Sequence, residues 1–392
     1  MEEWKEYKLG EVVNILDSKR VPLSSKERST RQGCYPYYGA QGIIDYIDDY
    51  LFDGTYLLIA EDGENLKSQK QNVAQLASGK YWVNNHAHIL ESNGESDIRY
   101  ICYLLNTLDL SGYITGSAQP KLNQANLVKI AFKLPPFEIQ KDIADCLSVF
   151  DNKIEVNRKI NENLEQQAQA LFKSWFVDFE PFKNGEFVES ELGMIPKGWR
   201  VVELQDVLTI KRGGSPRPIQ DYLSTSGYRW LKISDATACQ SPYIYEIKEF
   251  IKESGLCKTI KLSRGSLVLS NSATPGIPKI LGVDSCIHDG WLYFPQSQLS
   301  KYYLYMLFKE KRDFLLSQGN GSVFTNLKTD IVKAMKIAIP NEKIMSKFNT
   351  VLESLFILIE NKTIESLRLA ELRDTLLPKL MSGELKVGDV TL

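Results

Sequence analysis

The sequence is poor in the residues that build metal sites, disulfide frameworks and membrane spans. Only three of its 392 residues are histidine, and none of its six cysteines forms a Cys-x-x-Cys pair. Such spacing gives neither a zinc motif nor a disulfide framework, so reduced thiols are expected. The longest apolar run, residues 355–359, is far too short to cross a bilayer, and no apolar signal segment follows Met1. We therefore expect a cytoplasmic protein that binds neither a metal ion nor a membrane.

The net charge is also small, at −2, which excludes a strongly basic nucleic-acid coat. The charge is unevenly spread, because residues 181–340 carry 21 Lys and Arg against 15 Asp and Glu, while the other parts are mildly acidic. With 43% hydrophobic residues, the chain has enough apolar material for two cores. The composition therefore leaves room for a local basic surface on a folded protein.

Motifs of common enzymes are missing as well. There is no phosphate-binding Gly-x4-Gly-Lys-Ser/Thr segment and no glycine-rich strand-turn-helix of the nucleotide- or methyl-donor-binding kind. Leu134-Pro135-Pro136-Phe137 looks like the Asn/Asp-Pro-Pro-aromatic motif of amino-methyltransferases, but Leu134 has no polar group to bind an exocyclic amine. The prolines are better explained as the start of a helix. We predict no catalytic residue, and we interpret Glu61-Asp62-Gly63-Glu64 as a solvated turn.

The most informative feature is an internal repeat. Apolar and aromatic residues recur with the same spacing in both halves of the chain, at an offset of about 195 to 205 residues. One fold duplicated once, with small insertions, would produce this pattern. The aligned histidines are interpreted as supporting that shared fold. The matching pairs are Trp4 and Trp199, Leu9 and Leu204, Val12 and Val207, His86 and His288, Tyr100 and Tyr302, Tyr103 and Tyr305, and Leu105 and Leu307.

Each repeat has the same order of expected elements. Short β-branched and aromatic runs separated by Gly, Pro, Asn and Asp predict strands and turns. A short helix is expected at 100–108 and again at 302–308, and a long helix follows in each repeat. We therefore predict an α+β chain with mixed α/β domains in four parts: a globular domain at 1–136, a long helix at 137–180, a similar globular domain at 181–340, and a second long helix with its tail at 341–392.

Each long helix carries one apolar stripe. In the first helix gaps of three and four residues alternate, which is typical of a coiled-coil seam. The simplest way to bury both stripes is to pair the helices antiparallel, which predicts a pseudo-two-fold arrangement. The alternative is that each helix packs on its own domain. The predicted seam residues are Ile143, Leu147, Phe150, Ile154, Asn157, Leu164, Leu171, Phe348, Leu355 and Leu358.

Segments at the ends of these helices resemble a known family. Leu134-Pro135-Pro136-x3-Gln140-x2-Ile143 is similar to the start of the first long helix in the specificity subunits of type I restriction-modification systems. Residues 170–179 resemble the end of that helix, and residues 193–199 resemble the start of the second target-recognition domain. Residues 372–385 resemble the end of the second long helix. The resemblance covers essentially the whole chain.

The resemblance implies a non-catalytic subunit that reads double-stranded DNA. Each globular domain would be a target-recognition domain for one half of a split site, and the helices would set the spacing and dock two modification (methyltransferase) subunits. Restriction (motor-nuclease) subunits would join this core. No cofactor would bind this chain, whereas S-adenosylmethionine, ATP and Mg²⁺ would bind the partners. Two alternatives stay open: a bifunctional methyltransferase or nuclease fragment, and an adaptor with duplicated domains that binds no DNA.

Candidate DNA contacts lie in loops that can approach a nucleic-acid backbone. In residues 211–217 three cations flank a Gly-Gly-Ser turn after an expected strand, and residues 18–20 occupy the corresponding place in the first repeat. Arg binds phosphates or guanine edges, and Asn and Gln pair with adenine. The alternative for each loop is an exposed polar turn. The candidates are Ser18, Lys19, Arg20, Tyr38, Gly39, Gln41, Gln119, Lys121, Lys211, Arg212, Ser215, Arg217, Lys232, Asn271 and Thr274.

Overall fold

The computed structural model describes residues 4–69, 71–116, 119–317 and 326–390. The chain forms two compact units, which we call the first and second domains. The first domain consists of Met1–Lys153 with Leu369–Leu392, and the second of Ile154–Arg368. Each long helix contributes one part to each domain. This division therefore cuts across the four segments expected from the sequence.

The first domain contains two four-stranded sheets and a two-stranded ladder. The antiparallel sheet has the order β2-β9-β6-β7, and the mixed sheet has the order β4-β3-β8-β5, with β3 and β8 parallel. The ladder pairs β1 with β10. The strands are β1 (Lys5–Lys8), β2 (Val13–Ile15), β3 (Gln32–Gly39), β4 (Gly42–Ile47), β5 (Phe52–Asp53), β6 (Tyr56–Ala60), β7 (Ala74–Ala77), β8 (Lys80–Val83), β9 (Ala87–Ser92) and β10 (Ala131–Leu134). The helices before the long ones are α1 (Leu9–Val12), α2 (Ser25–Ser29), α3 (Asn65–Ser68), α4 (Ile98–Thr107) and α5 (Gln124–Leu127).

The second domain contains two five-stranded sheets, a two-stranded ladder and a hairpin. The sheets have the orders β14-β23-β20-β21-β17 and β15-β18-β16-β22-β19, the ladder pairs β13 with β24, and β11 pairs with β12. The strands are β11 (Phe187–Ser190), β12 (Gly193–Pro196), β13 (Arg200–Glu203), β14 (Leu208–Arg212), β15 (Leu223–Ser224), β16 (Tyr228–Leu231), β17 (Tyr243–Ile244), β18 (Glu249–Ile251), β19 (Ile260–Leu262), β20 (Leu267–Ser270), β21 (Pro278–Leu281), β22 (Ser285–Ile287), β23 (Trp291–Ser297) and β24 (Lys336–Ile339). The short helices are α7 (Leu204–Val207), α8 (Ile233–Ala238), α9 (Lys301–Glu310), α10 (Arg312–Ser317) and α11 (Thr329–Lys333).

The two domains share one topology. The order β14-β23-β20-β21 repeats β2-β9-β6-β7, and β18-β16-β22-β19 repeats β4-β3-β8-β5. The parallel pair β16 and β22 matches the parallel pair β3 and β8. The second domain extends its sheets by β17 and β15 and adds the β11–β12 hairpin. The predicted duplication and the mixed α/β class are confirmed.

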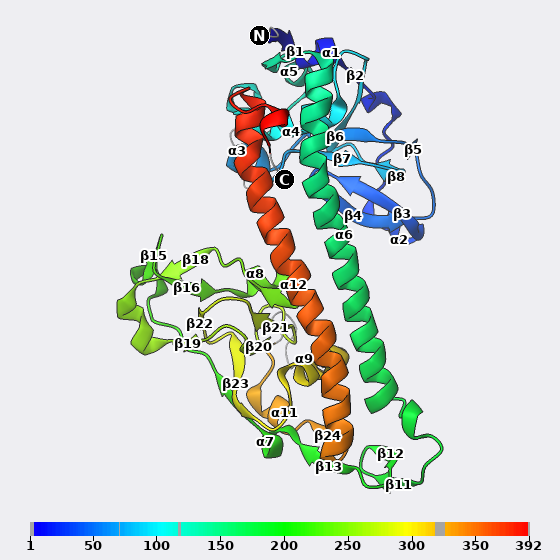
Figure 1. Ribbon diagram of the computed structural model, residues 1–392, viewed down its shortest axis with the longest axis vertical. Helices are drawn as coiled ribbons and strands as arrows, with labels where there is room; N and C mark the ends of the chain where they lie inside the picture. Colours follow the sequence, from blue (N-terminus) through cyan, green and yellow to red (C-terminus); the bar gives the residue numbers. More distant parts are fainter. Residues whose placement is uncertain (1–3, 70, 117–118, 318–325, 391–392) are drawn as a thin grey trace. The chain divides into compact units, whose positions relative to one another are not determined.

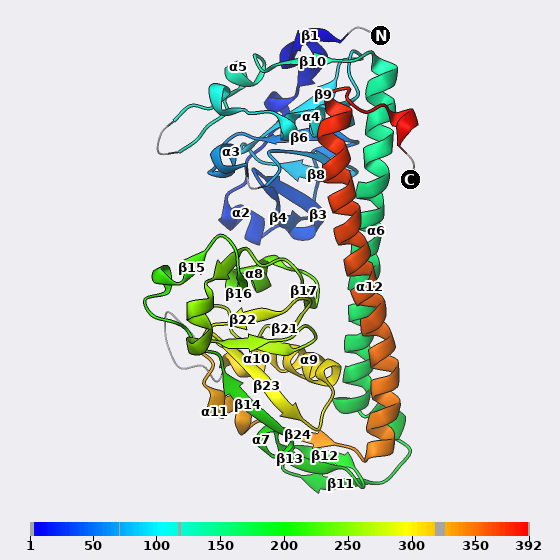
Figure 2. The same ribbon diagram turned by 60° about the vertical axis from the view of Figure 1, so that its left-hand side comes forward.

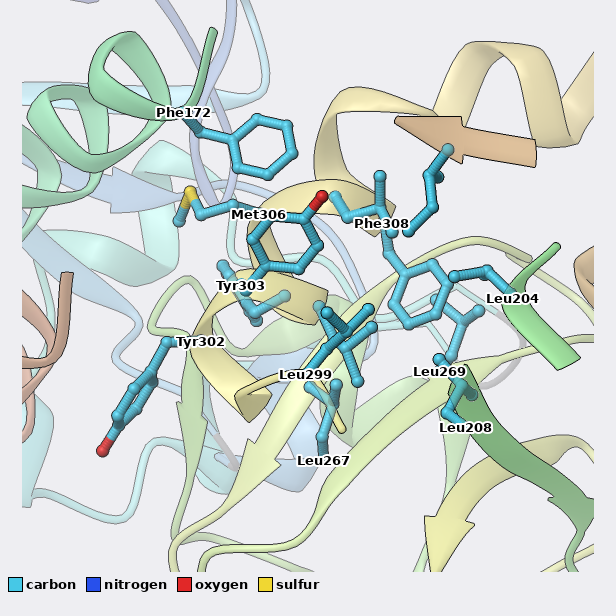
Figure 3. Close-up of a cluster of buried hydrophobic side chains, with 14 of the residues drawn as sticks. Phe172, Leu204, Leu208, Leu267, Leu269, Leu299, Tyr302, Tyr303, Met306 and Phe308 are labelled. Carbon is cyan, nitrogen blue, oxygen red and sulfur yellow. The ribbon is translucent and has the colours of Figure 1, made fainter. Parts of the chain in front are cut away.

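A helix packs on the β2-β9-β6-β7 sheet of the first domain and on the matching β14-β23-β20-β21-β17 sheet of the second. Asp97 caps α4 by accepting hydrogen bonds from the N–H groups of Arg99 and Tyr100, and Ser300 caps α9 in the same way through the N–H of Tyr303. In the second domain, Phe308 of α9 lies beside Leu269 of β20 (Figure 3), and it shares one buried cluster with Leu267 and Leu269. Burying such side chains stabilises a fold by about 1.5–3 kcal/mol each. The core of each domain therefore lies between this helix and its sheet.

Two long helices, α6 (Phe137–Phe176) and α12 (Glu342–Met381), complete the fold. Gln140 holds the start of α6, because its Oε1 accepts from the N–H of Asp97 (3.1 Å) and its Nε2 donates to the carbonyl of Pro135 (2.9 Å). Asn341 caps α12, because its side-chain oxygen accepts from the N–H of Ile344 (3.1 Å). Within the first domain the two helices are antiparallel neighbours. Ile143, Ala144 and Leu147 pack in one cluster with Leu380 and Met381, and Arg373 is bonded to Asp151.

Within the second domain the same two helices are also antiparallel, as Figures 1 and 2 show. Asn157 donates to Glu365 (3.1 Å), and one turn further along α6 Asn161 donates to Thr363 (3.1 Å). Both helices pack on α9 as well, since the ring centroids of Phe172 and Tyr303 lie 5.3 Å apart and those of Phe356 and Tyr302 lie 4.7 Å apart. The two long helices therefore pair with each other and also pack on the rest of the domain. The two alternatives weighed from the sequence are not exclusive.

The predicted seam is wrong at Leu358, whose exposed fraction is 48%. The buried stripe of α12 instead runs through Phe348, Leu352, Phe356 and Ile359. These residues are buried because α12 packs against both α6 and α9. The buried stripe therefore differs from the one that a contact with α6 alone would produce. Of the other predicted seam residues, Ile154, Leu164, Leu171 and Leu355 are half-buried, and Ile143, Leu147, Phe150, Asn157 and Phe348 are buried.

Candidate nucleic-acid interface

A loop between β14 and β15 forms one wall of a pocket in the second domain. Its glycines allow close approach to neighbouring strands: a Cβ on Gly213 would lie 2.2 Å from the carbonyl oxygen of His288, and one on Gly214 would lie 2.8 Å from that of Lys258. The pocket has a volume of about 760 Å³. Three predicted DNA contacts, Ser215, Arg217 and Lys232, line it together with His288 and Ser272. The structure therefore brings together residues that lie far apart in the sequence.

Asp289, which was not among the predicted contacts, organises this loop. Its Oδ1 accepts a hydrogen bond from the Ser215 hydroxyl (2.6 Å), and its Oδ2 forms an ion pair with Nη2 of Arg217 (3.1 Å). Its backbone carbonyl accepts from Nε of Arg212. The bond from Ser215 and the nearby arginines outweigh partial burial and lower the pKa of Asp289. Arg217 stays 78% exposed at the mouth of the pocket.

Two further lysines of the second domain lie over aromatic rings. Nζ of Lys258 lies 4.9 Å from the ring centroid of Tyr222, and Nζ of Lys261 lies 5.2 Å from that of Tyr228. Lys232 forms an ion pair with Glu249. Cations and aromatic faces together suit phosphates and bases. The net positive charge of residues 181–340 was the sequence signal for cations in this domain, although it did not identify these residues.

Three other candidates in the second domain differ in exposure. Asn271 is only 4% exposed, its N–H donates to the carbonyl of Gly290 (2.9 Å), and its own carbonyl accepts from Leu327 (2.8 Å). Asn271 therefore has a structural place in the loop. The expectation that its amide is exposed to contact DNA is wrong. Thr274, three residues later, is half-buried, and Lys211 at the end of β14 is exposed.

In the first domain, the corresponding arginine is occupied by its own fold. The side chain of Arg20 is 15% exposed, and its guanidinium donates to the carbonyls of Asp17 (3.1 Å) and Ala87 (2.9 Å) and to the carboxylate of Glu61 (2.8 Å). These hydrogen bonds engage the guanidinium within the fold. The expectation that Arg20 contacts DNA is not supported by this geometry. The adjacent Ser18 and Lys19 are exposed.

Glu61 neutralises two of the predicted DNA-contacting cations. It accepts from Arg20, and its Oε1 lies 3.1 Å from Nζ of Lys121. Burial opposes its charge, but the hydrogen bonds from Arg20 and Lys121 outweigh it and lower the pKa of this carboxyl. Its side chain is 14% exposed, so the interpretation of residues 61–64 as a solvated turn is wrong at Glu61. The turn forms an ion-pair network because the cations approach it from distant parts of the chain.

The β3–β4 turn lies against this network. Gln41 is exposed at the turn, and its Nε2 would lie 3.7 Å from a Cβ on Gly63. Gly39 is buried, and Tyr38 is half-buried against Tyr81, with ring centroids 5.3 Å apart. Gln119 is exposed beside Lys121. The uncharged donors Gln41 and Gln119 are thus the accessible candidates of the first domain, together with Ser18, Lys19 and the half-exposed Lys121.

The histidines bond within their own domains. Nδ1 of His86 lies 2.7 Å from Asp62, and Nδ1 of His288 accepts from the N–H of Gly290 (2.8 Å). His88 is 1% exposed, with its ring nitrogens 2.6 Å from Asp17 and 2.7 Å from the carbonyl oxygen of Leu122. Across the described ranges no group of three or more His, Cys, Asp or Glu side chains is placed to hold a metal ion. In the same ranges no helix has the length and apolarity needed to cross a membrane.

Comparison with known proteins assigns the chain to a family. The family model described as the type I restriction modification DNA specificity domain matches residues 1–166 and again residues 196–369. The MjaIX type I restriction enzyme specificity subunit of Methanocaldococcus jannaschii is 31% identical over 307 residues, covering 74% of this chain and 70% of that protein. A putative type I restriction enzyme specificity subunit of Haemophilus influenzae is 28% identical over 373 residues, covering 94% and 91%.

A solved structure has the same fold. The crystal structure of the type I restriction-modification S subunit from M. genitalium covers 97% of this chain and 96% of its own, with a TM-score of 0.59 at 15% identity. The two family matches fall on the two domains that share one topology. The chain belongs to the specificity subunits of type I restriction-modification enzymes, a family of DNA-recognition and not of catalytic subunits.

Proposed function

We propose that each domain binds one half of a two-part DNA target, and that the paired helices hold the two half-site readers at a set spacing. The duplication carries this proposal: two domains of one topology present corresponding loops after β2 and β14, with different side chains. Two similar folds with different contact residues read two different half-sites. On this proposal residues 1–136 and 181–340 are the two target-recognition domains, and residues 137–180 and 341–392 are the spacer helices with the tail.

The helices also dock the partner subunits. Apolar side chains stay exposed along both of them, which is costly in water unless another protein covers them. These exposed side chains contact two modification (methyltransferase) subunits. Restriction (motor-nuclease) subunits then bind to the complex of this chain with the modification subunits. S-adenosylmethionine, ATP and Mg²⁺ bind the partners and not this chain, and the complex acts in the cytoplasm on double-stranded DNA. The exposed large apolar residues among those described are Phe137, Val149, Val156 and Ile160 on α6 and Val351, Ile357, Leu358 and Leu372 on α12.

The low net charge predicts a division of labour in DNA binding. Three of the candidate DNA-contacting cations, Arg20, Lys121 and Lys232, have carboxylate partners within the fold and are less available to phosphates. The isolated chain therefore binds DNA weakly and in a strongly salt-dependent way, and the modification subunits add most phosphate contacts. Sequence choice comes from this chain, and most of the affinity comes from the complex.

The test has two arms. Genomic DNA from cells with and without the gene is sequenced for modified adenines, and the two-part motif that depends on the gene is identified. Duplexes with this motif or a scrambled sequence are then titrated with the isolated chain and with its complex with the modification subunit, across a salt series. We expect tight, motif-dependent binding only by the complex. A gene-independent methylation pattern, or equal binding of both duplexes by the complex, contradicts the proposal, and nanomolar motif binding by the isolated chain at physiological salt contradicts the division of labour.

A further inference from the structure

We propose that Arg217 reads a guanine in the half-site of the second domain, and that Asp289 is the positioning residue that orients it. This inference rests on the proposed DNA-reading function and adds the chemistry of one contact. It starts from the difference between the two domains: Arg217 is 78% exposed, whereas Arg20 of the first domain is 15% exposed and already bonded.

The guanidinium of Arg217 is held but not used up. Arg has five N–H donors in a planar fork, and Asp289 takes one of them at 3.1 Å. The carboxylate is itself fixed, because its other oxygen accepts from Ser215 and the Ser215 hydroxyl lies 3.3 Å from the backbone nitrogen of Asp289. A flexible side chain is thereby restrained before binding, which lowers the entropy lost when it docks. The remaining donors stay available for the O6 and N7 acceptors of guanine.

The charge at this position favours a base edge over a phosphate. Asp289 compensates the charge of Arg217 and would repel a phosphate placed beside it. A base edge is read by the pattern of donors and acceptors and needs no net charge. The neighbouring cations are less suited to this role: Lys232 is a point charge paired with Glu249, and Arg212 has its Nε bonded to the Asp289 carbonyl and does not line the pocket.

The surroundings of Arg217 suit insertion into a groove. It lies at the rim of the pocket with Ser215, Lys232, Ser272 and His288. The pocket wall is shaped by Gly213 and Gly214, which permit contacts that a side chain would block. In the first domain the accessible candidates with an amide are Gln41 and Gln119, which suit adenine. The second domain is therefore the one whose half-site contains the guanine read by an arginine.

The experiment couples one side chain to one base. The complex with the modification subunits is titrated with the duplex that carries its motif, and each guanine is replaced in turn by 7-deazaguanine, which lacks the N7 acceptor. We expect the complex with the natural Arg217 to bind about tenfold more weakly when one particular guanine is replaced. The Arg217→Ala complex should bind the native duplex about tenfold more weakly and show no further loss at that guanine. Asp289→Ala should give a smaller coupled loss at the same guanine only, which a general structural defect would not do.

Arg200→Ala is the matched control, because it removes an exposed arginine from β13 of the same domain, at the opposite end from β16 in both views (Figures 1 and 2). This complex should keep the tenfold loss at the guanine. If Arg217→Ala does not assemble, Arg217→Gln replaces it, since it removes the fork and keeps an amide. The proposal is overturned if every guanine effect persists in the Arg217 variant, or if no guanine affects the unmodified complex. Equal binding of motif and scrambled duplexes would instead reject the DNA-reading function itself.

Discussion

Asn157 of α6 donates a hydrogen bond to Glu365 of α12 across 3.1 Å, while its own side-chain oxygen is buried without a hydrogen-bond partner. Nδ2 of Asn157 lies 3.3 Å from Ser366 as well, and Asn161 reaches Thr363 one turn away. In this part of their contact the two helices therefore meet at a polar layer. A buried Asn in such a contact selects one register of the helices at a cost in stability.

Replacing this amide should separate stability from register. Asn157→Leu removes the unpaired oxygen, so we expect the free energy of unfolding to rise by about 1 kcal/mol. In a cysteine-free background with Asn157 present, a cysteine at 161 should form a disulfide with a cysteine at 363 and not with cysteines at neighbouring positions of α12. With Leu at 157, this preference for 363 should be weaker. Denaturant unfolding and a cross-linking ladder measure the two effects. A loss of stability in the Leu variant would contradict this account of the polar layer.

The ion pair between Arg373 and Asp151 should stabilise the first domain modestly. Asp151 also accepts from the hydroxyl of Tyr103, so α4, α6 and α12 meet at one carboxylate. Since Arg373 and Asp151 are partly exposed, solvent screens them, and Arg373→Ala should lower the free energy of unfolding by about 1 kcal/mol. Arg158→Ala is the control, because its pairs lie on one exposed helix face and should contribute at most about 0.5 kcal/mol. Equal effects of both variants in urea unfolding would refute this ranking.

Acid should weaken the network around Glu61. Its pKa is lower in the folded chain than the ordinary value of 4.5, so its contribution is present above that value and is lost as the pH falls through the folded pKa. Glu61→Gln should therefore cost about 2 kcal/mol at pH 7 and make unfolding less sensitive to acidification below about pH 5. Glu64→Gln, which removes an exposed carboxylate three residues away, is the control for loss of a negative charge from the same turn. Parallel pH profiles for Glu61→Gln and the parent chain would show that the network is not the acid-sensitive element.

The exposed apolar face of α12 should matter for assembly and not for folding. Leu358→Asp places a charge where a partner would exclude water, so we expect the affinity for the modification subunit to fall by at least about tenfold. Val188→Asp changes a comparably exposed apolar residue on β11, away from the helices, and should leave assembly intact. Size-exclusion chromatography and titration calorimetry read the assembly, and melting temperatures check the fold. Unchanged affinity with Leu358→Asp would remove this face from the docking surface.

The core should respond more strongly than any of these surface sites. Phe172 is 1% exposed, and its ring lies against Phe176, Tyr303 and Phe348. Phe172→Ala leaves a cavity where the two long helices and α9 meet, so it should cost about 3–5 kcal/mol in urea unfolding. Leu171→Ala, at the half-buried neighbouring position, should cost clearly less. Similar losses for both would show that the packing at Phe172 is not the centre of this core.

The sequence predicted the architecture well because the repeat and the helix stripes are local patterns. Helix α6 begins directly after Pro135 and Pro136, as the interpretation of these prolines as a helix start predicted. The stripe of α12 was harder, since a third element, α9, shares its buried face, and periodicity cannot tell one packing partner from two. Leu358 was assigned to the wrong side for this reason.

The candidate interface was predictable only as a set of loops. Arg20 and Arg217 have the same chemistry in the sequence, but a carboxylate 41 residues away occupies Arg20 within the fold, and one 72 residues away holds Arg217 at the surface. Asn271 looked like a surface amide until strand pairing placed it in the interior. Which carboxylate pairs with which arginine depends on the order of strands in the sheets. The spacing of residues along the sequence does not give this order.

The two carboxylates that hold these arginines come from non-equivalent places in the repeated fold, Glu61 after β6 and Asp289 before β23. Aligning one half of the molecule on the other would therefore transfer the cation without its counter-ion. On the DNA-reading function proposed above, a loop grafted from one domain to the other should be moved together with the acidic residue, because that residue fixes the position of the arginine.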